Sequence, residues 1–357
     1  MRGAATAAAV LLVALGGCGD AAPPRPPPPL QERPVRIVAV GDLFLGGDAE
    51  EELRREGPDH AFRHLAPLLA GGDLLLGNLE APVTASQIPR FPQKAVNVRM
   101  EPAALSALAD AGFDLLSLAN NHVLDHGPEG LQDTTAALDA AGIRHVGAGR
   151  DLEEAIRGEV FEVAGVRIGV LGFMESYALY DDYAWYAAPG HPGVARLSRP
   201  VVRDALARLR PHVHVLVVTV HWGMDNADLM PTQRAWARRL ADLGADLVVG
   251  HHPHVAQGIL VEGGVPIVAS LGNAAYGRDA DFGGRDAVGR LGWVAEATIE
   301  DGRVAQVDLV PIVVDAAQVG GAPRPADPAV LPVLLARHRA DGCVPLGIAG
   351  DRARWRR

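Results

Sequence analysis

Cysteine is nearly absent from this chain of 357 residues, which contains only Cys18 and Cys343. A fold held together by several disulfides is therefore excluded, and thiolates cannot dominate a metal site. Hydrophobic residues make up 48% of the chain and charged residues 21%. This is an ordinary globular mixture, so we expect the protein to be held together by its core alone.

Positive charge is also in deficit, since the formal net charge is −10. A protein that binds nucleic acid would be expected to carry a basic patch, and the sequence shows none of useful size. The short basic end, DRARWRR, is interpreted as a solvated tail. We therefore expect no nucleic acid among the partners.

The N-terminal hydrophobic run is too short for a comfortable membrane span. It follows Arg2, ends at Leu15 and leads through small residues to Cys18. This pattern predicts a signal peptide over residues 1–18, and the ending LGGC resembles a bacterial lipoprotein processing site at which Cys18 receives a lipid. The alternative is ordinary signal cleavage beside an incidental cysteine.

Proline is concentrated in residues 19–34, where it occupies seven positions between Pro23 and Pro34. This composition predicts an extended, semi-rigid spacer. Signal and spacer together predict an exported, membrane-anchored lipoprotein that faces the periplasm or the cell exterior. We expect the folded domain over residues 35–315, followed by a C-terminal extension over residues 316–357 that packs on the domain or is partly disordered.

Continuous apolar runs alternate with helical patterns along the folded part. The runs indicate strands buried on both faces and cover residues 35–40, 73–77, 114–119, 214–220, 246–250 and 266–270. Helical spacing covers residues 101–113, 130–142, 198–210 and 231–244. A hairpin with Asp301-Gly302 in its turn follows late in the chain. The alternation predicts an α/β fold with a largely parallel sheet and some antiparallel pairing.

Polar residues follow the strands at six places, and ligands bind outside the carboxyl ends of strands in such sheets. These residues are Asp42, Asn78 with Glu80, Asn121 with His122, His221, His252 with His254, and Asn273. A single one would be read as a turn former, a helix cap or a structural histidine. Six together favour a metal site, and carboxylate, amide and imidazole groups suit Mn²⁺, Fe²⁺ or Zn²⁺.

The stretch VVGHHPHVAQG places three histidines directly after an apolar run. On an extended segment, His252 and His254 would point to one face, because side chains alternate with period two. Pro253 would stiffen this two-pronged grip on a metal, and His251 would point away towards a supporting partner. The alternative pair, His251 with His254, would need a turned segment.

A set of motifs resembles a known family. The motifs AVGDLFLGG, GNLE, SLANNHVLDHG, VHWGMD, GADLVVGHHPHVAQG and SLGN look like those of the CapA family of poly-γ-glutamate capsule synthesis proteins, over about residues 35–315. That family is similar to calcineurin-like metallophosphoesterases. The resemblance implies two facing mixed β-sheets flanked by helices, a four-layer sandwich with metal ligands in the loops at one edge.

The resemblance also implies roles for individual residues. Asp42 and His254 would bind a first divalent ion, Glu80 would bridge, and a second ion would be bound by Asn121, His221 and His252. His122 would be catalytic, protonating the leaving group as imidazolium, and Asp125 would orient it. The phosphoesterase pattern opens Asp-x-His, but Phe44 stands at the histidine position, so the first site has one protein ligand fewer.

Two classes of function follow, with one or two ions bound. The first is a metal-dependent hydrolase of a small phosphoester or of an amide such as a γ-glutamyl bond. The second is a non-catalytic component that binds or exports an anionic capsule polymer, in company with capsule-synthesis partner proteins. A metal site that has decayed within a scaffold is a third reading. The tyrosine-rich residues 175–195 are either a lid over the site or a folded-back surface loop.

Overall fold

The computed structural model describes residues 33–276, 291–314 and 322–357. The expected signal peptide, Cys18 and all but the last two residues of the proline-rich spacer lie outside the described residues. Within those three ranges, no helix combines the length and the apolar character needed to cross a bilayer.

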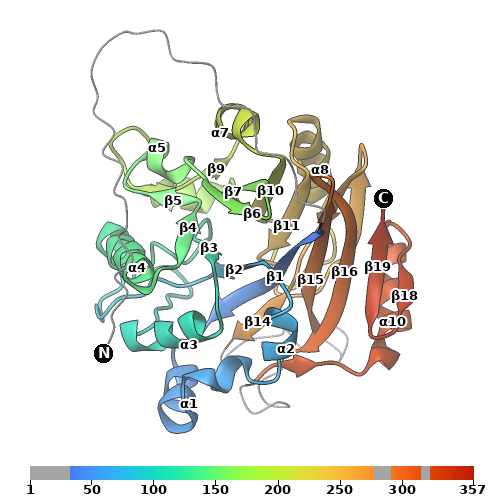
Figure 1. Cartoon of the computed structure of the whole chain (residues 1–357). Coiled ribbons are helices and arrows are strands. Elements are labelled where there is room, and N and C mark those ends of the chain that lie inside the picture. Colours follow the sequence, from blue (N-terminus) through green and yellow to red (C-terminus); the bar gives the residue numbers. More distant parts are fainter. Residues whose placement is uncertain (1–32, 277–290, 315–321) are drawn as a thin grey trace, which may run out of the picture.

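Two mixed β-sheets face each other in the centre of the molecule (Figure 1). The first has the order β18 (Gly347–Ala349), β19 (Arg352–Arg356), β16 (Arg303–Val313), β15 (Leu291–Glu300), β1 (Val35–Phe44), β2 (Leu74–Leu79), β3 (Leu115–Ser117), β4 (Arg144–Val146), with β14 (Asn273–Tyr276) on β1 and β17 (Arg324–Pro325) on β16. The second has the order β12 (Ile259–Glu262), β13 (Val265–Val268), β11 (Leu247–His251), β10 (Val215–His221), β7 (Val166–Glu175), β6 (Glu159–Val163), with β9 (Arg196–Leu197) on β7. A small pair, β5 (Ala148–Gly149) and β8 (Gly193–Val194), lies apart.

Each sheet has a parallel part, and those parts carry the candidate site. Strands β1 to β4 run parallel to one another, as do β7, β10, β11 and β13. The antiparallel part contains the expected hairpin of β15 and β16, in which Asp301 and Gly302 take φ angles of 50° and 70°. Positive φ at both turn residues is what a tight hairpin turn requires, so this prediction is confirmed.

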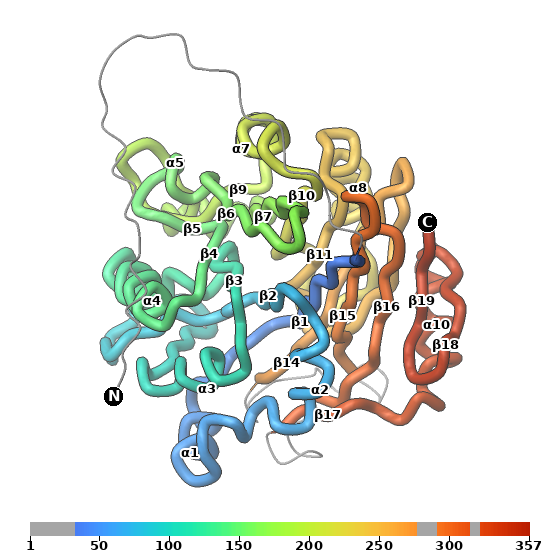
Figure 2. Tube along the Cα trace, in the orientation of Figure 1, coloured from blue at the N-terminus to red at the C-terminus, as the bar shows by residue number. Residues whose placement is uncertain are grey.

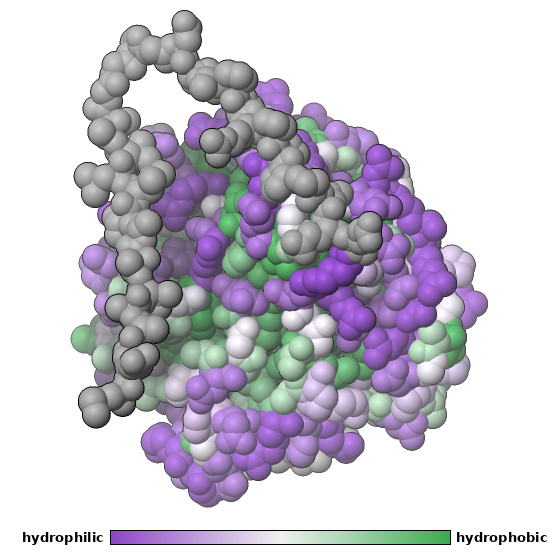
Figure 3. Space-filling view, viewed as in Figure 1, coloured by the Kyte–Doolittle hydropathy of each residue, from purple (hydrophilic) through white to green (hydrophobic). Residues whose placement is uncertain are grey.

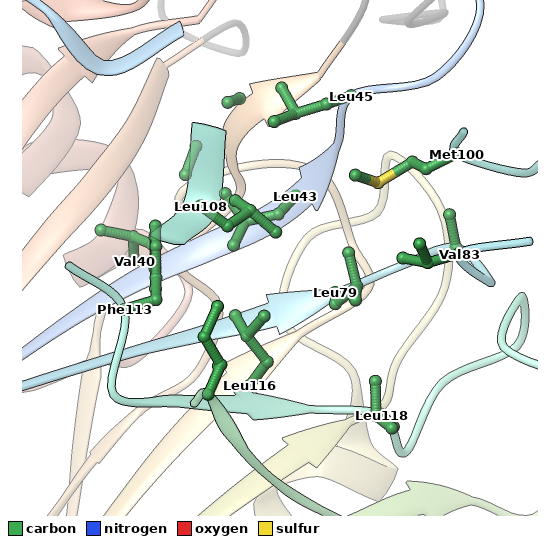
Figure 4. Packing of buried hydrophobic residues seen from close by; sticks show 14 of the residues in the cluster. Val40, Leu43, Leu45, Leu79, Val83, Met100, Leu108, Phe113, Leu116 and Leu118 are labelled. Carbon is green, nitrogen blue, oxygen red and sulfur yellow. The ribbon is translucent and has the colours of Figure 1, made fainter. Parts of the chain in front are cut away.

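Three hydrophobic layers hold the sheets and helices together. In β1, Val35, Ile37 and Ala39 face the second sheet, whereas Val38 and Val40 face the helices, because side chains alternate along a strand. The helical face of the first sheet is shown in Figure 4, where strand residues pack against the loop and helix beside them. The expected architecture of facing mixed sheets flanked by helices is confirmed.

The helices cover the two outer faces (Figure 1). On the first sheet lie α1 (Asp48–Glu56), α2 (Ala66–Leu69), α3 (Leu105–Asp110) and α4 (Gly127–Ala141). On the second lie α5 (Leu152–Ala155), α7 (Arg199–Leu209) and α8 (Pro231–Asp242). Figure 3 shows a largely hydrophilic rim, including the region of α1, around a more apolar middle on the face in view.

The C-terminal residues extend the first sheet. In α10 (Leu331–Ala340), Leu331, Leu334 and Leu335 are buried in the layer between the sheets. Strand β19 pairs antiparallel with β16, and Figure 2 shows β15 and β16 between β19 and β1. The described part of the expected extension, residues 322–357, therefore lies on the domain. The basic end is strand β19 with Ala353 and Trp355 buried, so its interpretation as a solvated tail was wrong.

The sequence patterns did not single out β7, although it is a central strand of the second sheet. Its segment VRIGVLGFME contains Arg167 and two glycines, which interrupt the apolar run used to find the other strands. Strand β7 matters for the site because Tyr177, two residues after its end, lies with its ring 5.9 Å from that of His252.

Candidate metal and catalytic site

One segment of backbone joins the ends of the two sheets. Residues 269–273 cross both, and the carbonyl of Gly272 accepts a hydrogen bond of 2.9 Å from the Asp42 amide. A Cβ at Gly41 would lie 1.9 Å from that carbonyl oxygen, and one at Gly250 would lie 2.0 Å from a carbonyl oxygen of the same segment. The glycines that precede Asp42 and His251 are therefore needed because the crossing backbone leaves no room for a side chain.

The crossing brings the predicted ligands into two overlapping groups. Donor atoms of Asp42, Glu80 and His254 lie within 4.8 Å of one another, and so do those of Glu80, His221 and His252. Glu80 belongs to both groups. Asn121 joins the second, since its Oδ1 lies 2.8 Å from Nε2 of His221. The structure therefore places side by side the residues that the motifs assign to a first ion, a second ion and a bridge.

Glu80 shows that these residues fit divalent ions. Its side chain is 0% exposed, and neither carboxylate oxygen makes a hydrogen bond. Burial, and then the charge of Asp42, raise its pKa well above the ordinary value. A buried carboxylate without a hydrogen bond is costly, and a cation coordinated by the oxygen and nitrogen atoms around it would remove that cost.

In the absence of an ion, protonated His254 provides a positive charge beside Glu80 and Asp42. Burial opposes protonation, but Glu80 and Asp42 raise the pKa of His254 to about 10. Its Nδ1 donates to Oδ1 of Asn273 at 2.8 Å, which directs Nε2 towards Glu80, 3.8 Å away. Burial opposes ionisation of Asp42, but the contacts from His251 at 3.3 Å and His254 at 3.4 Å outweigh it and hold the pKa of Asp42 well below its usual range. Binding of a metal would displace the His254 proton.

The histidine segment does not have the expected extended form. Strand pairing stops where His221 lies opposite His251, and His252 and His254 then take φ angles of 94° and 56°. These two side chains come together because the backbone turns around Pro253, so the period-two argument was wrong. Left-handed backbone is costly for residues other than glycine, and such strain tends to occur at functional sites. His251 contacts a predicted ligand, with Nδ1 3.3 Å from Oδ1 of Asp42.

His122 and Asp125 form the contact that the motif implies. Nδ1 of His122 lies 2.7 Å from Oδ2 of Asp125, and its Nε2 has no hydrogen-bond partner in the described ranges. Burial, followed by the charge of Lys94, lowers the pKa of His122, so the neutral ring is favoured at neutral pH. With its proton on Nδ1 for Asp125, the ring presents Nε2 as a proton acceptor.

Lys94 was not found from the sequence. Its ammonium group lies 2.5 Å from Oδ1 of Asp125, 3.1 Å from Nδ1 of His122 and 2.7 Å from the carbonyl oxygen of Asn121. Its side chain is buried, and burial lowers its pKa. Lys94 comes from a long loop after β2, so neither periodicity nor a strand end indicated it.

The tyrosine-rich segment packs against the site. It contains α6 (Ala178–Asp182), and the Tyr177 ring lies 5.9 Å from that of His252. The indole of Trp185 donates to the carbonyl oxygen of Asn120 at 3.0 Å and lies 5.2 Å from the Lys94 ammonium. Of the two expectations for residues 175–195, this arrangement favours a cover on the site.

Phe44 lies beside the first group without offering a ligand. Its ring is 5.2 Å from that of Tyr276, which is 5.3 Å from that of His254. Burial and the charges of Glu80 and Asp42 raise the pKa of Tyr276 well above its usual value. This side of the site is thus an aromatic wall.

Comparison with known proteins identifies the family. A sequence model of the family described as bacterial capsule synthesis protein PGA_cap matches residues 36–277. The chain belongs to this family. The resemblance inferred from the motifs is therefore confirmed.

Curated relatives of this chain are named as capsule proteins. The chain is 29% identical to the capsule biosynthesis protein CapA of Bacillus anthracis over 84% of this chain and 71% of that protein. It is 32% identical to the PGA biosynthesis protein CapA of Bacillus subtilis over 66% of this chain, and it spans 62% of that protein. A calcineurin-like phosphoesterase of Bacillus subtilis superposes with a TM-score of 0.48 at 15% identity, covering 88% of this chain and 98% of that one.

Proposed function

We propose that this member of the PGA_cap family is an exported, lipid-anchored hydrolase that uses two divalent ions to cleave a phosphoester or γ-glutamyl amide bond. The observation that carries the proposal is Glu80, a fully buried carboxylate without a hydrogen bond, shared by two groups of possible ligands. His122, the residue after Asn121, has its ring supported by the carboxylate of Asp125.

The ions would be held by side chains already in place. Asp42 and His254 would bind the first, His221, His252 and Asn121 the second, and Glu80 both. When bound, such ions make hydroxide available near neutral pH and polarise the oxygen of the bond under attack. The chain keeps these ligands in position through a second set of contacts, such as the 2.8 Å hydrogen bond from Asn78 to Asp42.

His122 would move the proton. Its neutral ring accepts a proton at Nε2 from the attacking water, and Asp125 stabilises the imidazolium through Nδ1. The proton then passes to the leaving amine or alkoxide, which restores the neutral ring. General acid–base catalysis of this kind contributes about 10²–10⁴-fold. Lys94 fixes the carboxylate of Asp125 and, with it, the orientation of the ring.

The names of the relatives indicate the substrate class. They are capsule and PGA biosynthesis proteins, so a γ-glutamyl polymer is the first substrate to test. Such a polymer is anionic, whereas the chain carries a net charge of −10, and bound ions would offset the repulsion. A lipid on Cys18 and a spacer over residues 19–34 would tether the domain within roughly 50 Å of a membrane.

Phe44 supports a second candidate function. Because a ligand is missing from the first motif, the protein could bind or export the anionic polymer, with capsule-synthesis partners, without cleaving it. In that case metal would act as a binding element. The two candidates differ in whether His122 is needed.

The test is replacement of His122 by Ala in the full chain. We expect hydrolysis of p-nitrophenyl phosphoesters, γ-glutamyl p-nitroanilide or poly-γ-glutamate to be lost, while metal content is unchanged. The matched variant Asn121→Ala, one residue away, should instead lose metal. If wild-type protein with full metal cleaves none of these substrates but retains the polymer, the second candidate replaces the first. Loss of metal from His122→Ala would show that His122 is a ligand.

A further inference from the structure

Asp225 lies at the site, although the motifs gave it no role. It belongs to the loop between β10 and α8, and donor atoms of Asp225, His252 and His254 lie within 4.8 Å of one another. Its Oδ1 is 3.4 Å from Nδ1 of His252. The His252 side chain is only 10% exposed, and its Nδ1 is buried without a hydrogen bond. An unpartnered nitrogen thus faces an available carboxylate.

The backbone fixes the position of this carboxylate. The amide of Trp222 donates to the carbonyl of His251 at 3.2 Å, and the amide of Asn226 donates to the carbonyl of Pro253 at 2.9 Å. These hydrogen bonds bracket Asp225 and attach its loop to the histidine segment on both sides. The side chain itself is 65% exposed, so it lies on the solvent side of the histidines and can rotate.

The charges around Asp225 favour binding of a cation. Asp42 and Glu80 already place two carboxylates next to His254. Across the described ranges, Asp225 has no Lys or Arg within salt-bridge distance; its one ion-pair contact is with His252. A third carboxylate in this position adds repulsion unless a positive ion is shared. Carboxylate together with imidazole is a donor set for Mn²⁺ and Zn²⁺.

We propose that Asp225 is a further metal ligand, which closes the candidate metal site on its solvent side. It would add a protein ligand beside His252 and His254, and His254 belongs to the group that lacks a histidine because of Phe44. As an exposed carboxylate, it can leave the ion when a substrate oxygen enters. This inference rests on the proposed function, since it requires that the site holds metal.

The test is calorimetric titration of Mn²⁺ and Zn²⁺ into the full chain after removal of metal with a chelator. In Asp225→Asn, which keeps size and removes charge, we expect the affinity for one ion to fall about tenfold or more. Asp225→Glu, which keeps the carboxylate, should recover most of the affinity. The matched control is Asp228→Asn, because Asp228 is an exposed carboxylate of the same loop that pairs with Arg337 at 2.6 Å instead. It should bind as wild type does.

A second readout examines coordination directly. With Co²⁺ bound, the visible absorption spectrum should change in Asp225→Asn and not in Asp228→Asn. If wild type binds ions and Asp225→Asn has the same affinity and spectrum, the inference is overturned and the proposed function stands. If wild type binds no ion, both are overturned.

Discussion

Glu80→Gln should have opposite effects on stability with and without metal. In the metal-free protein, Glu80 is fully buried and neither carboxylate oxygen makes a hydrogen bond. Leaving a buried polar group unsatisfied costs about 1–3 kcal/mol, and more when the group is charged. Gln has nearly the same shape, and its buried amide is also polar, but it has no charge. Because only the additional cost of the charge is removed, we expect the free energy of unfolding in chelator to rise by roughly 1 kcal/mol or more.

Metal should reverse the order of stability, so that wild type becomes more stable than Glu80→Gln. An ion present at 100 times its dissociation constant stabilises the folded state by about 2.7 kcal/mol. Wild type should gain this for each ion, whereas Glu80→Gln loses the shared ligand and should gain much less. Thermal unfolding in EDTA and in excess Mn²⁺ measures both effects, so the two Tm values should exchange order.

The pH dependence of stability independently gives the sign of the effect of Glu80 on the free energy of unfolding. The pKa of Glu80 in the folded state lies above its unfolded value of 4.5, because of burial and the charge of Asp42. Its effect is therefore destabilising at high pH and fades as the pH falls through the folded pKa towards 4.5. The advantage of Glu80→Gln in chelator should disappear in acid.

A satisfied buried carboxylate provides the control. Glu175 is also buried, but it accepts a 2.8 Å hydrogen bond from the amide of Gly223. Glu175→Gln should gain no stability in chelator. The reasoning is refuted if Glu80→Gln lowers Tm in EDTA and still shows the full wild-type stabilisation by Mn²⁺.

Two further predictions concern stability. Gly41→Ala should lower the free energy of unfolding by about 1–3 kcal/mol or more, because the new Cβ would lie 1.9 Å from the carbonyl oxygen of Gly272. Gly347→Ala, whose Cβ has 3.9 Å of room, should have a small effect in urea unfolding, and equal losses would contradict the close-approach argument. Burial lowers the pKa of His338 to about 4 from 6.5, so its contribution to stability is complete above pH 6.5 and is lost as the pH falls towards 4. Between pH 7 and pH 5, wild type should lose about 2 kcal/mol more than His338→Gln, which keeps a donor for the Ala256 carbonyl but does not titrate; parallel pH profiles would rule this out.

The rule that ligands bind at the carboxyl ends of parallel strands accounts for most of what the sequence could predict about the site. Apolar runs located most of the parallel strands, and the carboxyl ends of those strands lie together in the structure. Asp42, Glu80 and His221 were found because each follows or ends such a run. Strand β7 was missed because its glycines and Arg167 break the run.

The rest of the site comes from loops, whose sequences have no hydrophobic periodicity from which their structure could be predicted. Lys94 lies 27 residues before Asn121 in the sequence but contacts its carbonyl oxygen at 2.7 Å. Asp225 is four residues after His221, within a quoted motif, yet that it faces the histidines is shown by its 3.4 Å contact with His252 in the folded chain. Tertiary contacts of this kind can be seen only once the chain is folded.

Metal content per chain tests the central claim most directly. The full chain would be purified without added metal or chelator, and Mn, Fe and Zn would be measured by elemental analysis against protein concentration. The proposed function, with Asp225 completing the first group of ligands, predicts about two ions per chain. One ion would show that the substitution at Phe44 has removed the first site, and none would contradict a metal-dependent function altogether.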